Sequence, residues 1–219
     1  MNRSVWTRVL TLLLALILSN VWLAAESNEE RTVSIRIHDY AHIHDTALAR
    51  AQDVVSGMYG AIGVRTDWRG SLRQGDGTFD NVRQSESPFN NVGPSECGPS
   101  DLRLIILTSA MADRGVIPDS IIGFAAVERG VGGRVAYVIY DRIKEFASDT
   151  DVDDMRMMGI VMAHEIGHLL MMHQSHSDTG LMRGRWERSE FRADRPFDLE
   201  FSDPQALEIR RTLAGETAP

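Results

Sequence analysis

Two histidines and a glutamate occur within the five-residue segment His164-Glu165-Ile166-Gly167-His168. In a helix, residues four positions apart differ by about 40° around the axis, so both imidazoles can converge on one ion. Glu165 then lies about 100° round from His164, where its carboxylate can take a proton from a metal-bound water without being a ligand. The HExxH spacing therefore predicts that His164 and His168 bind Zn²⁺ and that Glu165 is the general base in the hydrolysis of an acyl bond.

The residues before the motif predict the helix that this geometry requires. Thr150 is a suitable N-cap, and Asp151, Asp153 and Asp154 would place negative charge in the first turn, where the helix dipole favours it. Apolar residues then recur at three- and four-residue steps as far as Leu169. The alternative is that two structural histidines lie one turn apart by chance.

A catalytic zinc needs a third protein ligand and keeps its fourth position open for water. The pattern HExxHxxGxxH fails here, because Met171 and Gln174 stand where that pattern has its glycine and its last histidine. His173 would point away from the metal if the helix continued, whereas His176 falls beyond the helix. We therefore expect His176 to be the third ligand.

A glutamate is the main alternative for the third ligand. Glu190 precedes Asp194 by four residues, so a helix would place both on one face. This resembles the gluzincins, the thermolysin-like enzymes in which a downstream glutamate completes the site and an aspartate one turn later orients a ligand histidine. A charged amphipathic turn on the surface would also explain both acids.

Three further residues have a functional and a structural interpretation. Met182, in Gly180-Leu181-Met182, could lie in a turn beneath the metal, although core packing explains it equally well. Tyr137 or Tyr140 could stabilise an oxyanion, but packing within a strand is the better explanation for both.

The N-terminus has the layout of a secretory signal. Arg3 and Arg8 precede the apolar run over residues 9–18, and Ala24-Ala25 follow before an acidic stretch. We expect residues 1–25 to be a signal peptide, or an uncleaved anchor over residues 9–25, and residues 26–32 to be a linker. The protein is then exported, either secreted or periplasmic, and meets a membrane only through this segment.

Charge and cysteine content exclude some classes of protein. The formal net charge of −8 argues against nucleic acid as a partner. Cys97 is the only cysteine, so neither an intramolecular disulfide nor a cysteine-based metal site can form.

The rest of the chain predicts one α+β domain over residues 33–215. Strands are expected over residues 33–38, 64–68, 102–107, 123–127 and 134–140, the last two as a hairpin, and helices from Asp45 to Gly60 or Gly63 and from Asp203 to about Leu213. Residues 70–100 are rich in Gly, Ser, Asn, Asp and Pro and predict a flexible surface loop. A small mixed sheet would pack on the helix that carries the HExxH motif.

The segment HEIGHLLMMHQSHSDTGLMRGRW resembles a group of uncharacterised bacterial exported proteins of metzincin-like character. In that group a HELGHLLL-type helix precedes an HSxxG[IL]M segment and a tryptophan, and the resemblance extends over residues 34–68, 123–142 and 201–206. It implies a zincin-like fold, with His164, His168 and His176 on zinc and Glu165 catalytic. The lone Cys97 and the polar loop over residues 70–100 depart from the group.

We therefore expect a zinc metalloendopeptidase that acts on a peptide or protein, which could lie along an exposed strand edge. A hydrolase of other amides or esters would use the same residues. A binding module without catalysis is less favoured, because Glu165 is present together with both histidines.

Overall fold

The computed structural model describes residues 31–72, 101–128, 132–186, 188–191 and 199–215 of the chain. The predicted signal or anchor over residues 1–25, Cys97, Asp194 and most of the predicted loop lie outside the described residues. Within the described part of the chain, no helix combines the length and the apolar character needed to cross a membrane.

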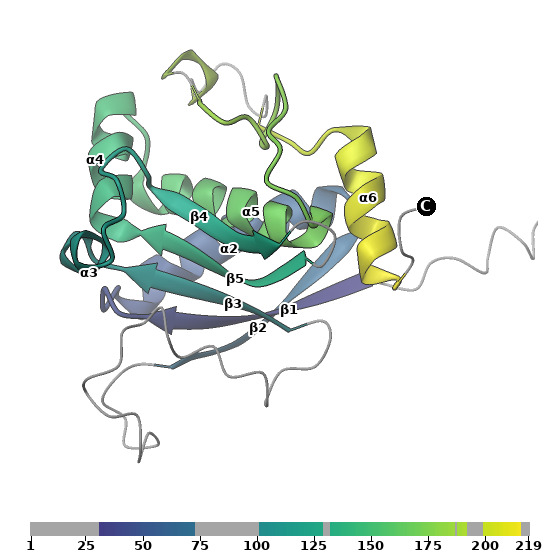
Figure 1. Ribbon diagram of the computed structural model, residues 1–219, viewed down its shortest axis with the longest axis horizontal. Helices are drawn as coiled ribbons and strands as arrows, with labels where there is room; N and C mark the ends of the chain where they lie inside the picture. Colours follow the sequence, from purple (N-terminus) through teal and green to yellow (C-terminus); the bar gives the residue numbers. More distant parts are fainter. Residues whose placement is uncertain (1–30, 73–100, 129–131, 187, 192–198, 216–219) are drawn as a thin grey trace, which may run out of the picture. The chain divides into compact units, whose positions relative to one another are not determined.

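Five strands form a mixed sheet in the order β2-β1-β3-β5-β4 (Figure 1). They are β1 (Arg31–Asp39), β2 (Val64–Leu72), β3 (Asp101–Leu107), β4 (Gly123–Glu128) and β5 (Gly132–Ile139). Neighbouring strands are parallel except for β4, which pairs antiparallel with β5 and confirms the predicted hairpin. β1 begins inside the predicted linker, and β2 extends two residues beyond residue 70 into the predicted loop.

Side chains alternate between the two faces of the sheet. Val33, Ile35 and Ile37 of β1 are buried in the main hydrophobic core, and Ile105 and Tyr137 belong to a smaller cluster on the opposite face. Full burial of one such aliphatic side chain contributes roughly 1.5–3 kcal/mol to folding. The alternation therefore fixes which face of the sheet packs in the main core and which faces the smaller cluster.

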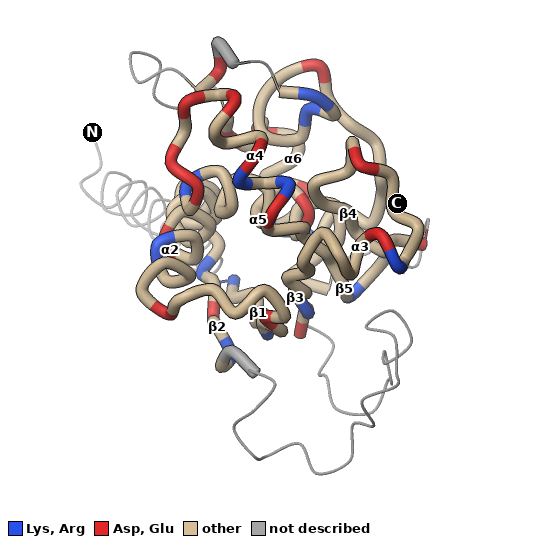
Figure 2. The backbone as a smooth tube through the Cα atoms, turned by 90° about the vertical axis from the view of Figure 1, so that its left-hand side faces the viewer, with Lys and Arg blue, Asp and Glu red and all other residues tan. Residues whose placement is uncertain are grey.

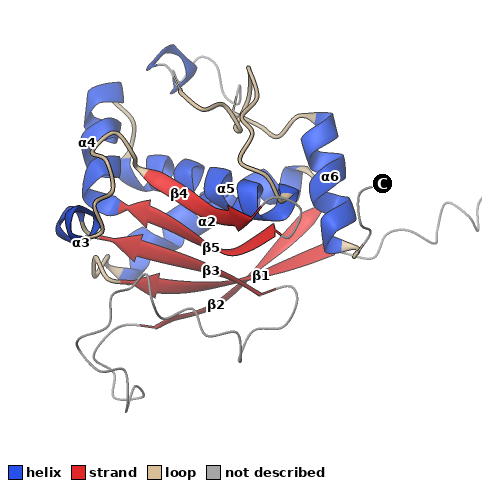
Figure 3. Cartoon of the chain, in the orientation of Figure 1, coloured by secondary structure: helices blue, strands red, loops and turns tan. Residues whose placement is uncertain are grey.

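The helices are α2 (Asp45–Ala61), α3 (Ser109–Arg114), α4 (Tyr140–Thr150), α5 (Asp154–Met171) and α6 (Asp203–Leu213), with a short 3₁₀ helix at Arg188–Phe191. α5 contacts α2, α4, α6, β4 and β5. Figure 3 shows α2 and α5 along the same face of the sheet, and the end-on view of Figure 2 shows the strands curving around α5. The predicted α+β fold, with a mixed sheet packed on the helix of the HExxH motif, is confirmed.

The start of α5 differs from the prediction. Asp153 is the N-cap, and its carboxylate accepts hydrogen bonds from the backbone N–H groups of Met155 and Arg156. Thr150 instead ends α4, where its hydroxyl donates to the carbonyl of Phe146. The prediction missed α4 and α3, and it also placed Tyr140 in a strand, whereas Tyr140 is the first residue of α4.

α5 is buried on all sides from Met157 to Met171, as expected for an apolar helix at the centre of a domain. Gly159 allows α2 to approach closely, because a Cβ there would lie 2.7 Å from the carbonyl oxygen of Ala51. The helix ends at Met171, and the C-cap residue that follows, Met172, has the left-handed φ of 55°. His173 therefore does not continue α5.

We expect His38 to make the stability of the fold depend on pH. His38 pairs with Ile105 on the face of the smaller cluster, and burial, followed by the charges of Arg103 and Arg36, lowers its pKa from 6.5 to about 4. Its Nε2 has no hydrogen-bond partner among the described residues. Between pH 6.5 and pH 4 the unfolded chain therefore takes up a proton that the folded chain does not, so this residue lowers the stability as the pH falls.

The variant His38→Gln should lose this effect. In urea unfolding at pH 7 and pH 5, we expect the parent to lose about 1 kcal/mol more stability than the variant, after allowance for the partial exposure of the ring. His42→Asn, a change at an exposed histidine with positive φ, is the matched control and should behave like the parent. Equal pH dependence in the parent and His38→Gln would contradict this assignment.

Candidate metal centre

Three imidazoles converge at the C-terminal half of α5. The Nε2 atom of His168 lies 3.0 Å from Nε2 of His164 and 3.2 Å from Nε2 of His176, and the three rings form a group that could hold a metal ion. Nitrogen ligands about 2.05 Å from a tetrahedral zinc would be separated by about 3.3 Å. The spacing and the all-nitrogen donor set therefore fit a zinc ion.

Backbone carbonyls orient two of these rings. Nδ1 of His164 donates to the carbonyl of Leu181 at 2.8 Å, and Nδ1 of His168 donates to the carbonyl of His173 at 2.9 Å. Because a carbonyl oxygen can only accept, the neutral ring carries its proton on Nδ1 and presents its lone pair at Nε2. This is the arrangement that fixes the tautomer of a ligand histidine.

A folded loop brings His176 to the other two histidines. The backbone N–H of Ser177 donates to the carbonyl of Met182 at 2.8 Å, and the N–H of Leu181 donates to the carbonyl of Glu200 at 2.9 Å. Gly184 passes beneath the ring, since a Cβ at this position would lie 3.0 Å from Cγ and Nδ1 of His176. The position of His176 thus depends on contacts within the loop and with the residues before α6.

The protein environment favours the neutral form of these histidines. Burial lowers the pKa of His164 and of His168 from 6.5 to about 4, against the opposing effect of their hydrogen bonds to backbone carbonyls. Burial also lowers the pKa of His176, although this residue is exposed by comparison. A metal binds the neutral imidazole, so the rings are ready to act as ligands at neutral pH.

Glu165 is 6% exposed and lies against the first residue of β4. A Cβ on Gly123 would come within 2.9 Å of both Oε1 of Glu165 and Cγ1 of Val161, so glycine is needed at position 123 for space. Burial raises the pKa of Glu165 from 4.5 to about 8. A cation held by the neighbouring histidines would oppose this shift and favour the carboxylate.

The two alternative third ligands do not join the histidine group. Glu190, in the 3₁₀ helix, forms an ion pair and hydrogen bond with Arg183. The ring of His173 accepts a hydrogen bond from the N–H of Ser175 at 3.2 Å and lies 3.6 Å from the carboxylate of Glu208. His173 therefore serves the cluster through its backbone carbonyl, whereas its ring faces α6.

Packing accounts for both Met182 and Tyr137. Met182 is fully buried, and a Cβ on Gly167 would lie 2.8 Å from its sulfur, so this side chain packs beneath α5 next to His168. Tyr137 lies on the opposite face of the sheet, stacked on Phe124 with 4.6 Å between the ring centroids. Packing thus explains Tyr137, and its hydroxyl is on the wrong face to stabilise an oxyanion at the cluster.

Trp186 contacts the cluster and Gly123 contacts Glu165, and neither residue was assigned a role from the sequence. Nε1 of Trp186 donates to the carbonyl of Leu181 at 3.2 Å, and its ring meets His164 edge-on with 5.1 Å between centroids. One carbonyl thus accepts from both the indole and the imidazole of His164. The tryptophan that follows the motif in the sequence was the only available signal, and it did not indicate this contact.

No family model matches the chain, and no curated protein sequence matches it. Among solved structures, the chain is similar to archaemetzincin from Methanopyrus kandleri, with 15% sequence identity, a TM-score of 0.48, and coverage of 85% of this chain and 98% of that one. It is also similar to metalloproteinase-II from Bacteroides fragilis, with 12% identity, a TM-score of 0.47 and coverage of 85% of this chain. The chain spans 54% of the length of that metalloproteinase.

Proposed function

We propose that this protein is a zinc-dependent hydrolase, and more specifically a metallopeptidase, with His164, His168 and His176 as zinc ligands and Glu165 as general base. The observation that carries the proposal is the convergence of three imidazole Nε2 atoms beside the buried carboxyl group of Glu165 in α5. Nε2 of His168 lies 3.0 Å from that of His164 and 3.2 Å from that of His176. The secretory layout of residues 1–25 supports action after export.

Glu165 carries the proton in the proposed reaction. Zinc bound by the three histidines would polarise the scissile carbonyl group and acidify a water molecule. Glu165 takes one proton from the water molecule as the water oxygen bonds to the carbonyl carbon. Glu165 then passes this proton to the amide nitrogen as the C–N bond breaks. The burial that raises the pKa of Glu165 helps it to hold the proton between these steps.

The edge of β4 is suited to an extended peptide. β4 is one of the two edge strands of the sheet, and its first residue, Gly123, touches the carboxyl group of Glu165. An added strand at this edge would pair with backbone groups of β4 while its scissile bond lies near the general base. This placement favours a peptide over a compact small-molecule amide.

Zinc content tests the ligand set. The purified chain should hold about one zinc ion, and His176→Ala should weaken zinc binding by more than the roughly 10–100-fold typical of changes around a metal ligand. Glu190→Ala and His173→Ala should keep their zinc, as should the control His42→Asn. Metal analysis and competition with a chelator measure these effects. Loss of zinc in Glu190→Ala but not in His176→Ala would favour the glutamate site, and a folded parent without zinc would refute the proposal.

Peptide hydrolysis tests the role of Glu165. Glu165→Gln should keep its zinc and cleave a mixed library of internally quenched peptides about 10²–10⁴-fold more slowly than the parent. Product analysis on peptides, on other amides and on esters in parallel separates a peptidase from another hydrolase. Equal hydrolysis rates in the two proteins would contradict the assignment of Glu165 as general base. A biological effect that Glu165→Gln leaves unchanged would instead indicate a binding module.

The contact at Gly123 gives a test that leaves the ligands untouched. The methyl group of Gly123→Ala must displace Glu165, Val161 or β4, and a misplacement near 1 Å can cost about 10²-fold in rate. We expect kcat to fall by about tenfold or more, with unchanged zinc content. Gly57→Ala is the matched control, since a Cβ there meets nothing within 4 Å. It should keep full activity and gain about 0.5–1 kcal/mol of stability. Full activity in Gly123→Ala would show that this contact does not position Glu165.

A further inference from the structure

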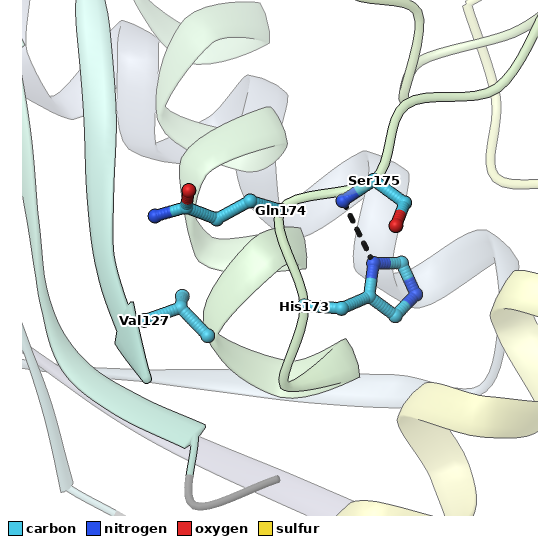
Figure 4. Close-up of a pocket in the computed structure, with 4 residues that line it drawn as sticks. All are labelled: Val127, His173, Gln174 and Ser175. Carbon is cyan, nitrogen blue, oxygen red and sulfur yellow. Dashed lines mark hydrogen bonds between the residues drawn. The ribbon is translucent and has the colours of Figure 1, made fainter. Parts of the chain in front are cut away.

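The side chain of Gln174 reaches across to β4, one of the two edge strands of the sheet. Its Nε2 donates a hydrogen bond of 3.2 Å to the backbone carbonyl of Ala125, in β4. Gln174 is itself exposed, and it lies in the segment that follows α5. In Figure 4 its amide points away from His173 and Ser175 towards the strand that carries Val127.

The carbonyl of Ala125 faces the edge of β4 that pairs with no other strand among the described residues. The N–H of Ile139 donates to the carbonyl of Ile122, and Phe124 pairs with Tyr137 two residues further along. In an antiparallel ladder every second residue bonds to the partner strand, so the backbone groups of Gly123 and Ala125 point the other way. The bond from Gln174 therefore takes an acceptor on the edge that a peptide strand would use.

This acceptor lies between the general base and a cavity. Gly123, two residues before Ala125, touches Glu165. Val127, two residues after it, lines a cavity of about 200 Å³ together with His173, Gln174 and Ser175 (Figure 4). A peptide that pairs along β4 past the carboxyl group of Glu165 would thus reach the Gln174 amide before it reaches the cavity.

We propose that Gln174 is a displaceable cap on the peptide-binding edge of β4. In the free enzyme the Gln174 amide donates a hydrogen bond to the carbonyl of Ala125. In the complex a backbone N–H of the bound peptide takes the place of this amide. The cap lowers the affinity for peptides, because the bond must break before that part of the edge can pair. This inference rests on the proposed peptidase function.

Peptide affinity in an inactive background tests the cap. The probe is a fluorescein-labelled form of the peptide that the parent cleaves fastest in the mixed library, and its Kd is measured by anisotropy with Glu165→Gln, alone and combined with Gln174→Ala or Gln174→Glu. We expect both double variants to bind about twofold to tenfold more tightly, the range for loss of one competing hydrogen bond. A carboxylate cannot donate, so Gln174→Glu should act like Gln174→Ala.

Two controls make the result specific. Gln52→Ala, the same chemical change on α2, should leave Kd unchanged. The tighter binding should disappear when the peptide is N-methylated at one position, because the methyl group removes the N–H that would meet Ala125. Zinc content is measured in every variant and should not change.

Unchanged or weaker peptide binding with full zinc content would overturn the cap and leave the peptidase proposal intact. Loss of zinc in Gln174→Ala would also overturn it, since Gln174 would then hold the segment that carries His173 and His176. If Glu165→Gln holds zinc but binds no peptide, the peptidase proposal itself fails, and the cap fails with it.

Discussion

The geometry of the histidine cluster depends on two hydrogen bonds from ring nitrogens to backbone carbonyls. Nδ1 of His164 and Nδ1 of His168 donate to the carbonyls of Leu181 and His173, which leaves both Nε2 atoms facing one point. Both carbonyls lie in the segment after α5, so the helix must end where it does. The left-handed φ of 55° at Met172 makes that possible, because it turns the chain back before the carbonyl of His173. The cluster is therefore a property of one helix and of the segment that folds back on it.

Close packing holds that helix in place. A Cβ at Gly159 would collide with α2, one at Gly167 would come within 2.8 Å of the sulfur of Met182, and one at Gly123 would reach the carboxyl group of Glu165. Each contact has a backbone or a buried side chain on its other side, so little relaxation is available. Burial of His164, His168 and Glu165 disfavours their charged forms. A metal ion would bind the neutral imidazoles, and its charge would favour the carboxylate form of Glu165. Metal binding should therefore be coupled to the stability of α5.

The sequence predicted what depends on local periodicity. HExxH on a helix, the alternation in β1 and the β4–β5 hairpin all have signals within a few residues, and each is present in the structure. α4 was missed because it begins directly after β5 with no turn residue between Ile139 and Tyr140, so the apolar strand pattern ran on into the helix. Thr150 and Asp153 are both good N-caps by residue type, and only the fold shows which one begins α5. Spacing could not choose between His176 and Glu190, because the approach of His176 depends on Gly184 and on the carbonyl of Glu200, far along the chain.

In the proposed peptidase, the edge strand β4 faces two opposing demands. Its unpaired backbone groups invite association with other strands, and proteins commonly cover or shorten such edges. A peptidase that binds its substrate there must nevertheless leave the edge available. β4 is short and has a register shift between Ala126 and Glu128. On the Gly123 side of this shift, the amide of Gln174 covers the carbonyl of Ala125. A single neutral hydrogen bond contributes only about 0.5–1.5 kcal/mol. A peptide that forms several backbone hydrogen bonds with β4 can exceed this contribution, whereas a chain that forms a single hydrogen bond there cannot. The same weak bond can thus protect the edge in the free protein and give way to a substrate.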